Sequence, residues 1–405
     1  SLLYSSNVIY NNGNEYLWLY TLAFMKRLVS NKYFPSVNNF TYLNTANVGL
    51  MLNAAEIEIN NWVKDLATNG SNNFNEIAEQ NIFVSLHKSA AKLINATSND
   101  IAAGSSATEL LSSLAWAIMP NKNQNVVSTN IVFPSTVYPW MRVASSTGCE
   151  IRLSKEKNNL INTIDIIELI DDSTSVVCIS HVEYTNGQVF DLDILCEAAH
   201  RHDALLIIDA TQSAGAIPID VNKTPVDAVV CGAYKWLCGP FGAAFMYVSP
   251  KLSEKIEPGL VGFRSHKNMW ELDPSRVDYP DSAEKFEFST MAFGCALGLA
   301  KSIDFINDIG VEAIFKYNRR LADTLVENLR SQSAVITSSE NNNRSSIVTA
   351  YFKNKDSNKI IEYLKKRKVY VSLRGKAIRF SPHLYNTIDD ISNANKEIDR
   401  AISHI

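Results

Sequence analysis

The sequence lacks the features that mark several specialised classes of protein. It has no long run of basic residues, no CxxC pair among its six cysteines and a formal net charge of only −4. A chain without a positive field has no general means of attracting nucleic acid, so we expect no nucleic-acid partner. The cysteines stand mostly in apolar segments, which is typical of free thiols in a reducing compartment, and this predicts a cytoplasmic location.

Long apolar runs are also scarce. The one candidate targeting element, YLWLYTLAFM at residues 16–25, follows Glu15 and precedes Lys26 and Arg27. Its length and charge order argue against both a signal peptide and a membrane span, so no membrane contact is expected. The 405 residues, 46% of them hydrophobic, have the composition of a globular protein with a sizeable core.

Short apolar runs alternate with capped amphipathic stretches over residues 106–248, which predicts an α/β fold with a mainly parallel sheet. The predicted strands are NVVSTN, CEIRLS, TSVVCIS, ALLIID, DAVVCGA and AAFMYVS. Ser106 with Glu109 predicts a capping box, and Asp191 a helix N-cap. A helical region follows from about residue 291 to 331, broken near Gly310. We expect a large domain at residues 46–290, a smaller C-terminal α/β domain at residues 291–405, and residues 1–45 packed with the small domain.

Two polar residues follow a buried strand in the segment IIDATQSAG. Asp209 stands at the carboxyl end of the predicted strand and Gln212 follows three residues later. Ligands of open α/β sheets bind at this edge. A carboxylate here suits a metal ligand, a ribose partner, a counter-ion for a bound cation or, equally well, a helix N-cap.

A lysine stands in an unusually apolar segment after the next strand. Lys235 lies between Tyr234 and Trp236 and precedes a glycine-containing turn. Because burial of an ammonium group is costly, the economical explanation is a lysine whose amine forms a Schiff base. The alternative is an amphipathic lysine that extends from a strand end to solvent. Farther upstream, small residues precede a capped helix in AAGSSATELL, where free N–H groups at residues 104–108 could bind a phosphate.

Together these motifs resemble the class V aminotransferase family of fold-type I pyridoxal-phosphate (PLP) enzymes, which includes cysteine desulfurases, selenocysteine lyases, kynureninase and isopenicillin N epimerase. The resemblance covers residues 42–386. It rests on the Asp-x-x-Gln of Asp209 and Gln212, on Tyr-Lys-Trp at residues 234–236, and on AIRFSPHLYNT at residues 377–387. It implies a large domain with a seven-stranded type of sheet, PLP as cofactor and a small amino acid as substrate.

The resemblance also implies roles for residues around the cofactor ring. Lys235 would hold PLP covalently and move the Cα proton as a general acid/base. Asp209 would pair with the pyridine nitrogen, and Gln212 would donate to the phenolate oxygen. Phe133 stands where the family places a ring against the cofactor, although a plain core role is its alternative. Tyr184 matches a position beside cofactor and substrate, whereas His181 is expected to be structural.

The phosphate and the substrate have their own candidates by the same resemblance. Ser106, Ala107, Thr108 and Tyr234 would contact the phosphate. Thr290 resembles the residue that reaches the phosphate of a neighbouring subunit, which predicts a homodimer with active sites at the interface. Arg379 resembles the arginine that binds the substrate α-carboxylate through its planar fork, with a solvated surface arginine as the alternative. Asn47 resembles part of an N-terminal loop that closes on the substrate.

The sequence departs from the desulfurase pattern in its cysteines and at the cofactor, where Phe133 and Tyr234 stand in place of the desulfurase histidines. Its last cysteine is Cys295, so no cysteine precedes Arg379 on a nearby loop to carry a persulfide. Transamination and C–S or C–Se β-lyase chemistry therefore both stay open, with kynureninase-like or epimerase activity as alternatives. A catalytically silent scaffold and a nucleotide- or sugar-phosphate-binding protein are alternatives of other classes. No metal site is predicted, because His200 and His202 do not share a helix face. The stretch at residues 261–288 is expected to shape specificity.

Overall fold

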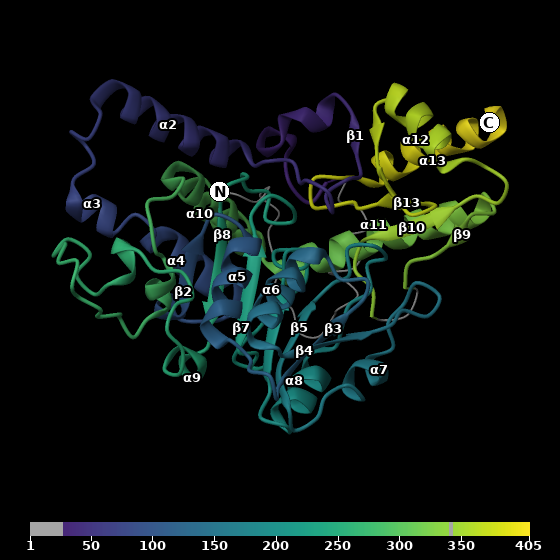
Figure 1. Ribbon diagram of the computed structural model, residues 1–405. Coiled ribbons are helices and arrows are strands. Elements are labelled where there is room, and N and C mark those ends of the chain that lie inside the picture. Colours follow the sequence, from purple (N-terminus) through teal and green to yellow (C-terminus); the bar gives the residue numbers. More distant parts are fainter. Residues whose placement is uncertain (1–26, 340–342) are drawn as a thin grey trace, which may run out of the picture.

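The fold is described by a computed structural model at residues 27–339 and 343–405. Its centre is a seven-stranded sheet in the order β2-β8-β7-β6-β5-β3-β4 (Figure 1). The strands are β2 (Ile101–Gly104), β3 (Asn125–Thr129), β4 (Glu150–Ser154), β5 (Thr174–Ser180), β6 (Leu205–Asp209), β7 (Ala228–Gly232) and β8 (Ala244–Val248). β8 runs antiparallel to both of its neighbours and the other described pairings are parallel. The predicted α/β fold with a mainly parallel sheet is therefore confirmed.

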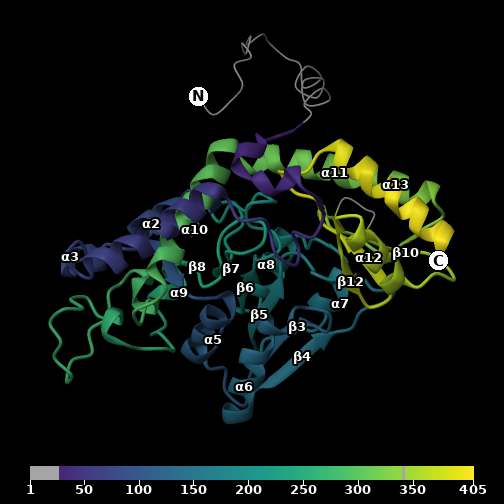
Figure 2. The same cartoon turned by 90° about the horizontal axis from the view of Figure 1, so that it is seen from above.

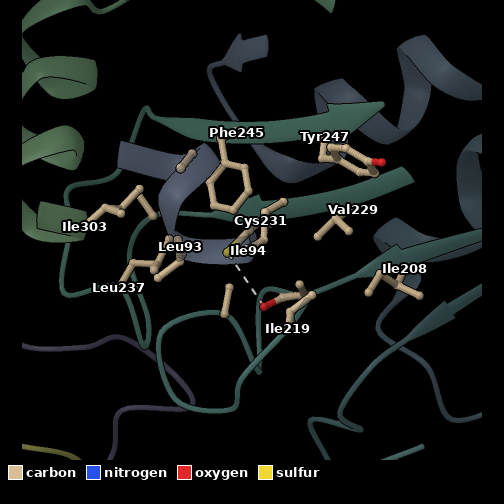
Figure 3. Packing of buried hydrophobic residues seen from close by; sticks show 14 of the residues in the cluster. Leu93, Ile94, Ile208, Ile219, Val229, Cys231, Leu237, Phe245, Tyr247 and Ile303 are labelled. Atoms are coloured by element: carbon tan, nitrogen blue, oxygen red, sulfur yellow. Dashed lines mark hydrogen bonds between the residues drawn. The ribbon is translucent and has the colours of Figure 1, made fainter. Parts of the chain in front are cut away.

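Helices cover both faces of this sheet, and successive side chains along each strand point to opposite faces. On β7, Val229 and Cys231 pack with α4 (Val84–Ile94), α8 (Leu192–His200) and α10 (Phe293–Ile309). Figure 3 shows the apolar side chains on this face, among them Leu93 and Phe245. Ala228 and Val230 face the opposite side, toward α5 (Ala107–Ile118) and α6 (Tyr138–Thr147). Burial on both faces explains why the strands read as continuous apolar runs.

Of two predicted helix starts, one forms as expected and the other forms only in part. The carboxylate of Asp191 accepts from the backbone N–H groups of Asp193 and Ile194 at 3.0 and 3.2 Å, as an N-cap does. Ser106 caps α5 by accepting from the Glu109 N–H at 3.2 Å. The Glu109 carboxylate bonds to Ser105 rather than to Ser106, so only half of the predicted capping box forms.

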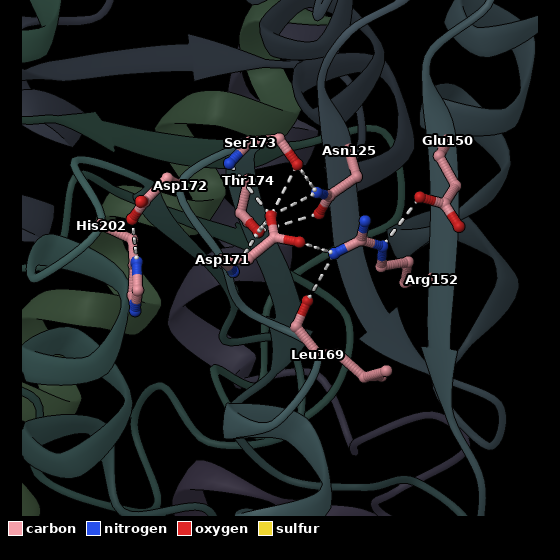
Figure 4. A network of polar contacts seen from close by, with 9 residues as sticks. All are labelled: Asn125, Glu150, Arg152, Leu169, Asp171, Asp172, Ser173, Thr174 and His202. Carbon is pink, nitrogen blue, oxygen red and sulfur yellow. Dashed lines mark hydrogen bonds and ion pairs between the residues drawn. The ribbon is translucent and has the colours of Figure 1, made fainter.

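A polar network joins the strands near their amino ends (Figure 4). Asp171, just before β5, accepts from Arg152 on β4 at 2.6 Å and from Asn125 on β3 at 3.1 Å. The hydrogen bond from the Ser173 hydroxyl, followed by the contact with Arg152, holds the pKa of this carboxyl well below the usual range. This network involves groups near the amino ends of the strands and none at their carboxyl ends.

A second, antiparallel sheet has the order β12-β13-β10-β9. Its strands are β9 (Val335–Ile336), β10 (Val348–Tyr351), β12 (Ser372–Arg374) and β13 (Ala377–Phe380). It packs with α11 (Val311–Ser331), α12 (Ser357–Lys366) and α13 (Ile388–His404), and Figure 2 shows α11 and α13 side by side. β1 (Thr41–Tyr42) pairs with β11 (Val369–Tyr370). The remaining helices are α2 (Asn53–Asn69), α3 (Glu76–Gln80), α7 (Thr163–Ile167) and α9 (Pro250–Ser253).

The packing bears on where the domains divide. The predicted boundary after residue 290 would assign α10 to the small domain, yet its Leu299 and Ile303 lie in the core of the large sheet. Of the N-terminal segment, Phe34 packs with that core and Leu43 with the small sheet. We propose that the small domain begins with α11. Residues 1–26, including the apolar run at 16–25, lie outside the described residues. Within the described residues no helix is long and apolar enough to cross a membrane.

Candidate functional site

The carboxyl ends of the parallel strands gather most of the predicted site residues at one edge of the large sheet. Asp209 is the last residue of β6, and Lys235 follows β7. Ser106, Phe133 and Tyr184 lie just beyond β2, β3 and β5. This edge is where ligands bind in open α/β sheets.

Asp209 lies at the floor of this edge and is 4% exposed. One carboxylate oxygen, Oδ1, accepts from the Thr211 N–H at 2.9 Å, and Oδ2 accepts from the Thr136 hydroxyl at 3.3 Å. Turns follow Asp209 and no α-helix begins directly after it, so the N-cap alternative does not apply. The carboxylate is oriented by two donors and keeps acceptor capacity for a further partner. Thr136 was not predicted from the sequence.

Lys235 is 7% exposed and its amine has no hydrogen bond or ion pair with any described residue. Nζ lies 5.5 Å from the ring centroids of both Phe133 and Tyr234. Burial lowers the pKa of Lys235 to about 8, an effect that Asp209 opposes and Arg379 reinforces. The pKa therefore leaves a useful fraction of the amine neutral near neutral pH, and a neutral amine is a nucleophile. A lysine extending to solvent is excluded by its burial.

Aromatic rings form the walls around this amine. Phe133 and Tyr184 meet edge to face with centroids 5.4 Å apart, and Tyr234 stacks on Phe241 at 4.6 Å. Phe133 is 40% exposed, so it lines the site rather than the core. Such rings offer faces for a flat heterocycle.

The start of α5 presents unused backbone donors. The N–H groups of Ala107 and Thr108 have no acceptor in the described chain, as expected for the first turn of a helix. The Thr108 hydroxyl bonds to that of Ser135 at 2.7 Å. These donors and the helix dipole suit a phosphate. Of the N–H groups at residues 104–108 that are predicted to be free, that of Ser105 instead donates to Glu109 Oε1 at 3.1 Å.

Gln212 ties the N-terminal loop to the site. Its amide nitrogen donates to the Ala46 carbonyl at 2.9 Å and its oxygen accepts from Trp236 Nε1 at 2.8 Å. One amide N–H of Gln212 stays available for the role implied by the resemblance. The same loop binds the segment around Lys235 through the Gly49 N–H, which donates to the Tyr234 carbonyl at 2.8 Å. Asn47 is exposed on this loop.

The loop is also held by the C-terminal part of the chain. The Thr45 and Tyr385 hydroxyls lie 2.6 Å apart, and the Ala46 N–H donates to the Ser381 hydroxyl at 2.9 Å. His383 contacts the Trp236 carbonyl at 2.8 Å. Segments from both ends of the sequence therefore enclose the lysine.

Arg379 on β13 is completely buried. Nε donates to the Ser372 hydroxyl at 3.2 Å and Nη1 to the Tyr184 carbonyl at 2.7 Å, while Nη2 has no partner. Burial, and then the charge of Arg374, lower the pKa of Arg379 to about 9. The solvated alternative is excluded. Arg379 has no carboxylate partner among the described residues, and a buried guanidinium of this kind has the chemistry to bind an anion.

Three further residues complete the description. Glu183 is fully buried near Asp209, with Oε1 accepting from the Thr129 hydroxyl at 3.0 Å and Oε2 unpartnered. His181 is buried, and burial lowers its pKa to about 4. Thr290 is exposed, and its side chain has no hydrogen bond with the described part of the chain. Glu183 could not be predicted, since nothing in the sequence marks it as buried.

A protein-family model and several known proteins match this chain over most of its length. Residues 51–393 match the family model for class-V aminotransferases. An uncharacterized aminotransferase, YcbU, of Bacillus subtilis is 27% identical over 92% of this chain and 97% of its own length. A probable cysteine desulfurase of Methanothermobacter thermautotrophicus is 26% identical over 74% of this chain and 79% of its own.

Solved structures share the fold at lower identity. The apo cysteine desulfurase of Thermococcus onnurineus has a TM-score of 0.83 at 19% identity and covers 93% of this chain and 98% of its own. The cystine C–S lyase C-DES, bound to its product cysteine persulfide, has a TM-score of 0.83 at 21% identity over 90% and 99%. A mutant of C-DES with glycine covalently linked to its PLP cofactor has a TM-score of 0.84 at 20% identity over 91% and 99%. These likenesses confirm the predicted fold-type I architecture.

Proposed function

The chain belongs to the class-V aminotransferase family, and from that premise we propose that it is a PLP-dependent enzyme acting at the Cα of a small α-amino acid. One observation carries the proposal. Lys235 is a buried amine with no ionic partner in the part of the chain that the structure describes, and it lies among aromatic rings at the sheet edge where Asp209 also ends its strand. A lysine in that setting suits covalent attachment to a carbonyl group.

The unsatisfied groups of the site fit PLP. The free N–H groups of Ala107 and Thr108 suit its phosphate, with Ser106 as the N-cap directly before them; Tyr234, whose ring lies near Lys235, would be a further phosphate contact. The ring faces of Phe133 suit a planar heterocycle, and the buried Asp209 suits a protonated ring nitrogen. The N–H groups of Ala107 and Thr108 have no acceptor in the described chain, and Asp209, although it accepts from Thr211 and Thr136, keeps acceptor capacity for a ring N–H group.

The residues divide the work by their chemistry. Lys235 would hold the cofactor and, once displaced by the substrate amine, would take and return the Cα proton at Nζ. Its lowered pKa suits that exchange, because proton transfer is efficient when the pKa lies near the working pH. Asp209 would keep the ring nitrogen protonated through its negative charge. When bound, PLP supplies a conjugated ring that accepts the electrons left when a bond to Cα breaks.

Arg379 would bind the substrate α-carboxylate, which supplies the anion that its buried guanidinium lacks. Transamination and β-elimination both begin with loss of the Cα proton, so both are compatible with this site. A desulfurase route that stores sulfur on a nearby cysteine is disfavoured, because residues 296–405 contain no cysteine. Kynureninase-like or epimerase activity and a silent scaffold are the alternatives that product analysis separates.

We also propose that the working unit is a homodimer. Thr290 is exposed and its side chain has no hydrogen bond with the described residues, so it is available to a neighbouring subunit, as a role at that subunit's phosphate site requires. A reducing, cytoplasmic location is proposed from the thiols, since all six cysteines are free and five are buried.

The test is the visible absorption spectrum of the purified protein with added PLP, before and after borohydride. We expect a band that disappears on reduction, with the reduced cofactor found on the Lys235 peptide by mass spectrometry. Lys235→Ala should abolish the band, whereas Lys285→Ala, which removes another buried lysine, should keep it. Keto-acid formation would then indicate transamination, and pyruvate with sulfide would indicate β-elimination. A folded protein that gains no band would refute the proposal, and bound PLP without turnover would support the scaffold alternative.

A further inference from the structure

A second arginine lies beside Arg379 on the same face of a hairpin. β12 and β13 pair in antiparallel register, with Ser372 opposite Arg379 and Arg374 opposite Ala377. Arg374 and Arg379 are therefore diagonal neighbours, and such pairs lie roughly 7–8 Å apart at the backbone. Both guanidinium groups extend from one small patch of sheet.

Neither arginine has a carboxylate partner among the described residues. Arg379 Nη2 and Arg374 Nε are buried without any hydrogen-bond partner. Arg374 Nη1 donates only to the carbonyl of Leu373, its neighbour in sequence. Burial lowers the pKa of Arg374, and burial together with the charge of Arg374 lowers the pKa of Arg379. Two cations that repel each other and lack anions leave room for two anionic groups of a ligand.

Arg374 lies on the same side of the site as the reactive lysine. Its Cζ lies 5.7 Å from the Tyr184 ring, and that ring meets Phe133, whose centroid is 5.5 Å from Lys235 Nζ. The charge of Arg374 also contributes to the lowered pKa of Lys235, after burial and Arg379. Arg379 is completely buried whereas Arg374 is partly exposed, so a ligand that bridges them runs from the floor toward solvent.

We propose that the substrate is an amino acid with a second anionic group on its side chain, bound by Arg374 while Arg379 binds the α-carboxylate. This inference rests on the proposed function, because that function makes the ligand an α-amino acid. Guanidinium is suited to both contacts, since its fork donates two parallel bonds to a carboxylate. A neutral side chain would leave the buried Nε of Arg374 without an acceptor, which disfavours such substrates.

The main competing arrangement is one in which both arginines share a single α-carboxylate. The two arrangements differ in what a dicarboxylate gains over a monocarboxylate. If the arginines bind separate anions, succinate or glutarate should bind far more tightly than propionate or butyrate. If they share one anion, the second carboxylate should bring no gain.

The first experiment uses the full-length protein freed of cofactor, so that no amine chemistry is involved. Its midpoint unfolding temperature is followed with succinate, glutarate, propionate and butyrate at matched ionic strength. We expect a saturable rise with the dicarboxylates that the monocarboxylates do not match. Arg374→Gln should remove the excess, and Lys376→Gln, which removes an exposed positive charge from the same hairpin, should keep it.

The second experiment uses the holoenzyme and compares kcat/KM for aspartate and glutamate with that for alanine and cysteine. The acidic substrates should be preferred, and Arg374→Gln should lower the ratio of acidic to neutral by about 10- to 100-fold. Arg374→Lys should restore part of the ratio because it retains the charge. Circular dichroism of each variant shows whether a loss comes from misfolding.

Equal shifts with mono- and dicarboxylates, or an unchanged ratio in folded Arg374→Gln, would overturn the inference. Failure of the proposed function has a different signature, since Lys235 would then bind no PLP whatever the carboxylates do. A dicarboxylate preference in a protein that binds no PLP would leave the anion pair standing and remove only the amino-acid assignment.

Discussion

Replacing Glu183 by glutamine should make the protein more resistant to alkaline pH. This side chain is fully buried beside Asp209, and its Oε2 has no partner. Burial, opposed by the bond from Thr129 and assisted by the charge of Asp209, raises the pKa of Glu183 to about 8. Below that pH the folded protein keeps the carboxyl neutral, whereas the unfolded chain ionises it at its ordinary value.

The sign and size of the effect follow from this difference in pKa. Between about pH 4.5 and pH 8 the folded state holds a proton that the unfolded state has released, so the free energy of unfolding falls as pH rises. Each pKa unit corresponds to about 1.36 kcal/mol, which makes the whole loss on the order of 3–5 kcal/mol. Glutamine has the same shape and no charge, so Glu183→Gln should abolish this loss.

The assay is thermal unfolding of the cofactor-free protein and of Glu183→Gln between pH 5.5 and pH 8.5. The variant should match the wild type or lie slightly below it at the acid end and unfold roughly 4–6 °C higher at the alkaline end. Glu327→Gln, which neutralises an exposed carboxylate, should show no such divergence. A difference between variant and wild type that stays constant with pH would show that the carboxyl is already ionised in the fold.

Three other outcomes are expected. Gly49→Ala should lower activity at least tenfold, because its Cβ would collide with the carbonyl of Lys235; normal kinetics in a folded variant would contradict this. Glu287→Ala should lower the free energy of unfolding by about 2–4 kcal/mol, because buried His87 would lose its carboxylate partner. Glu287 raises the pKa of His87 against the effect of burial. Denaturant unfolding should therefore show that the difference in free energy of unfolding between the wild type and Glu287→Ala narrows as pH rises above 6.5. Among the six thiols only half-buried Cys295 should react with a thiol reagent in the native state, and mass spectrometry would reveal any other labelled cysteine.

The large sheet was predictable because its strands carry their own signal. Runs such as LLIID and AVVCG are apolar and β-branched, and burial on both faces makes them continuous. β2 was not predicted, because Ile101–Gly104 is short and made mostly of weak strand formers. The packing of α10 was equally hidden, since an apolar helix face does not say which of two cores it joins.

The site shows the same division. Asp209 and Lys235 were found because each ends or follows an apolar strand, where a charged residue is conspicuous. Arg374 was not predicted as a site residue, although the alternation of side chains along the hairpin SLRGKAIR places it on the same face as Arg379. Glu183 was beyond reach because its burial depends on tertiary packing, and its raised pKa has no counterpart in the sequence.

The loop at residues 44–50, clasped by the C-terminal segment, has a consequence for how the protein is made. Ala46 bonds to Ser381, a partner 335 positions later in the chain, and Thr45 meets Tyr385 at 340 positions. At about 5–20 residues per second, a ribosome needs roughly 20–70 s to supply those partners. Lys235 is made 146 residues before Ser381 (381 − 235), so for roughly 7–30 s the nascent lysine lacks the C-terminal segment that holds this loop. A chain truncated before Ser381 would contain the large domain and its lysine but would lack the C-terminal segment that holds the loop at residues 44–50.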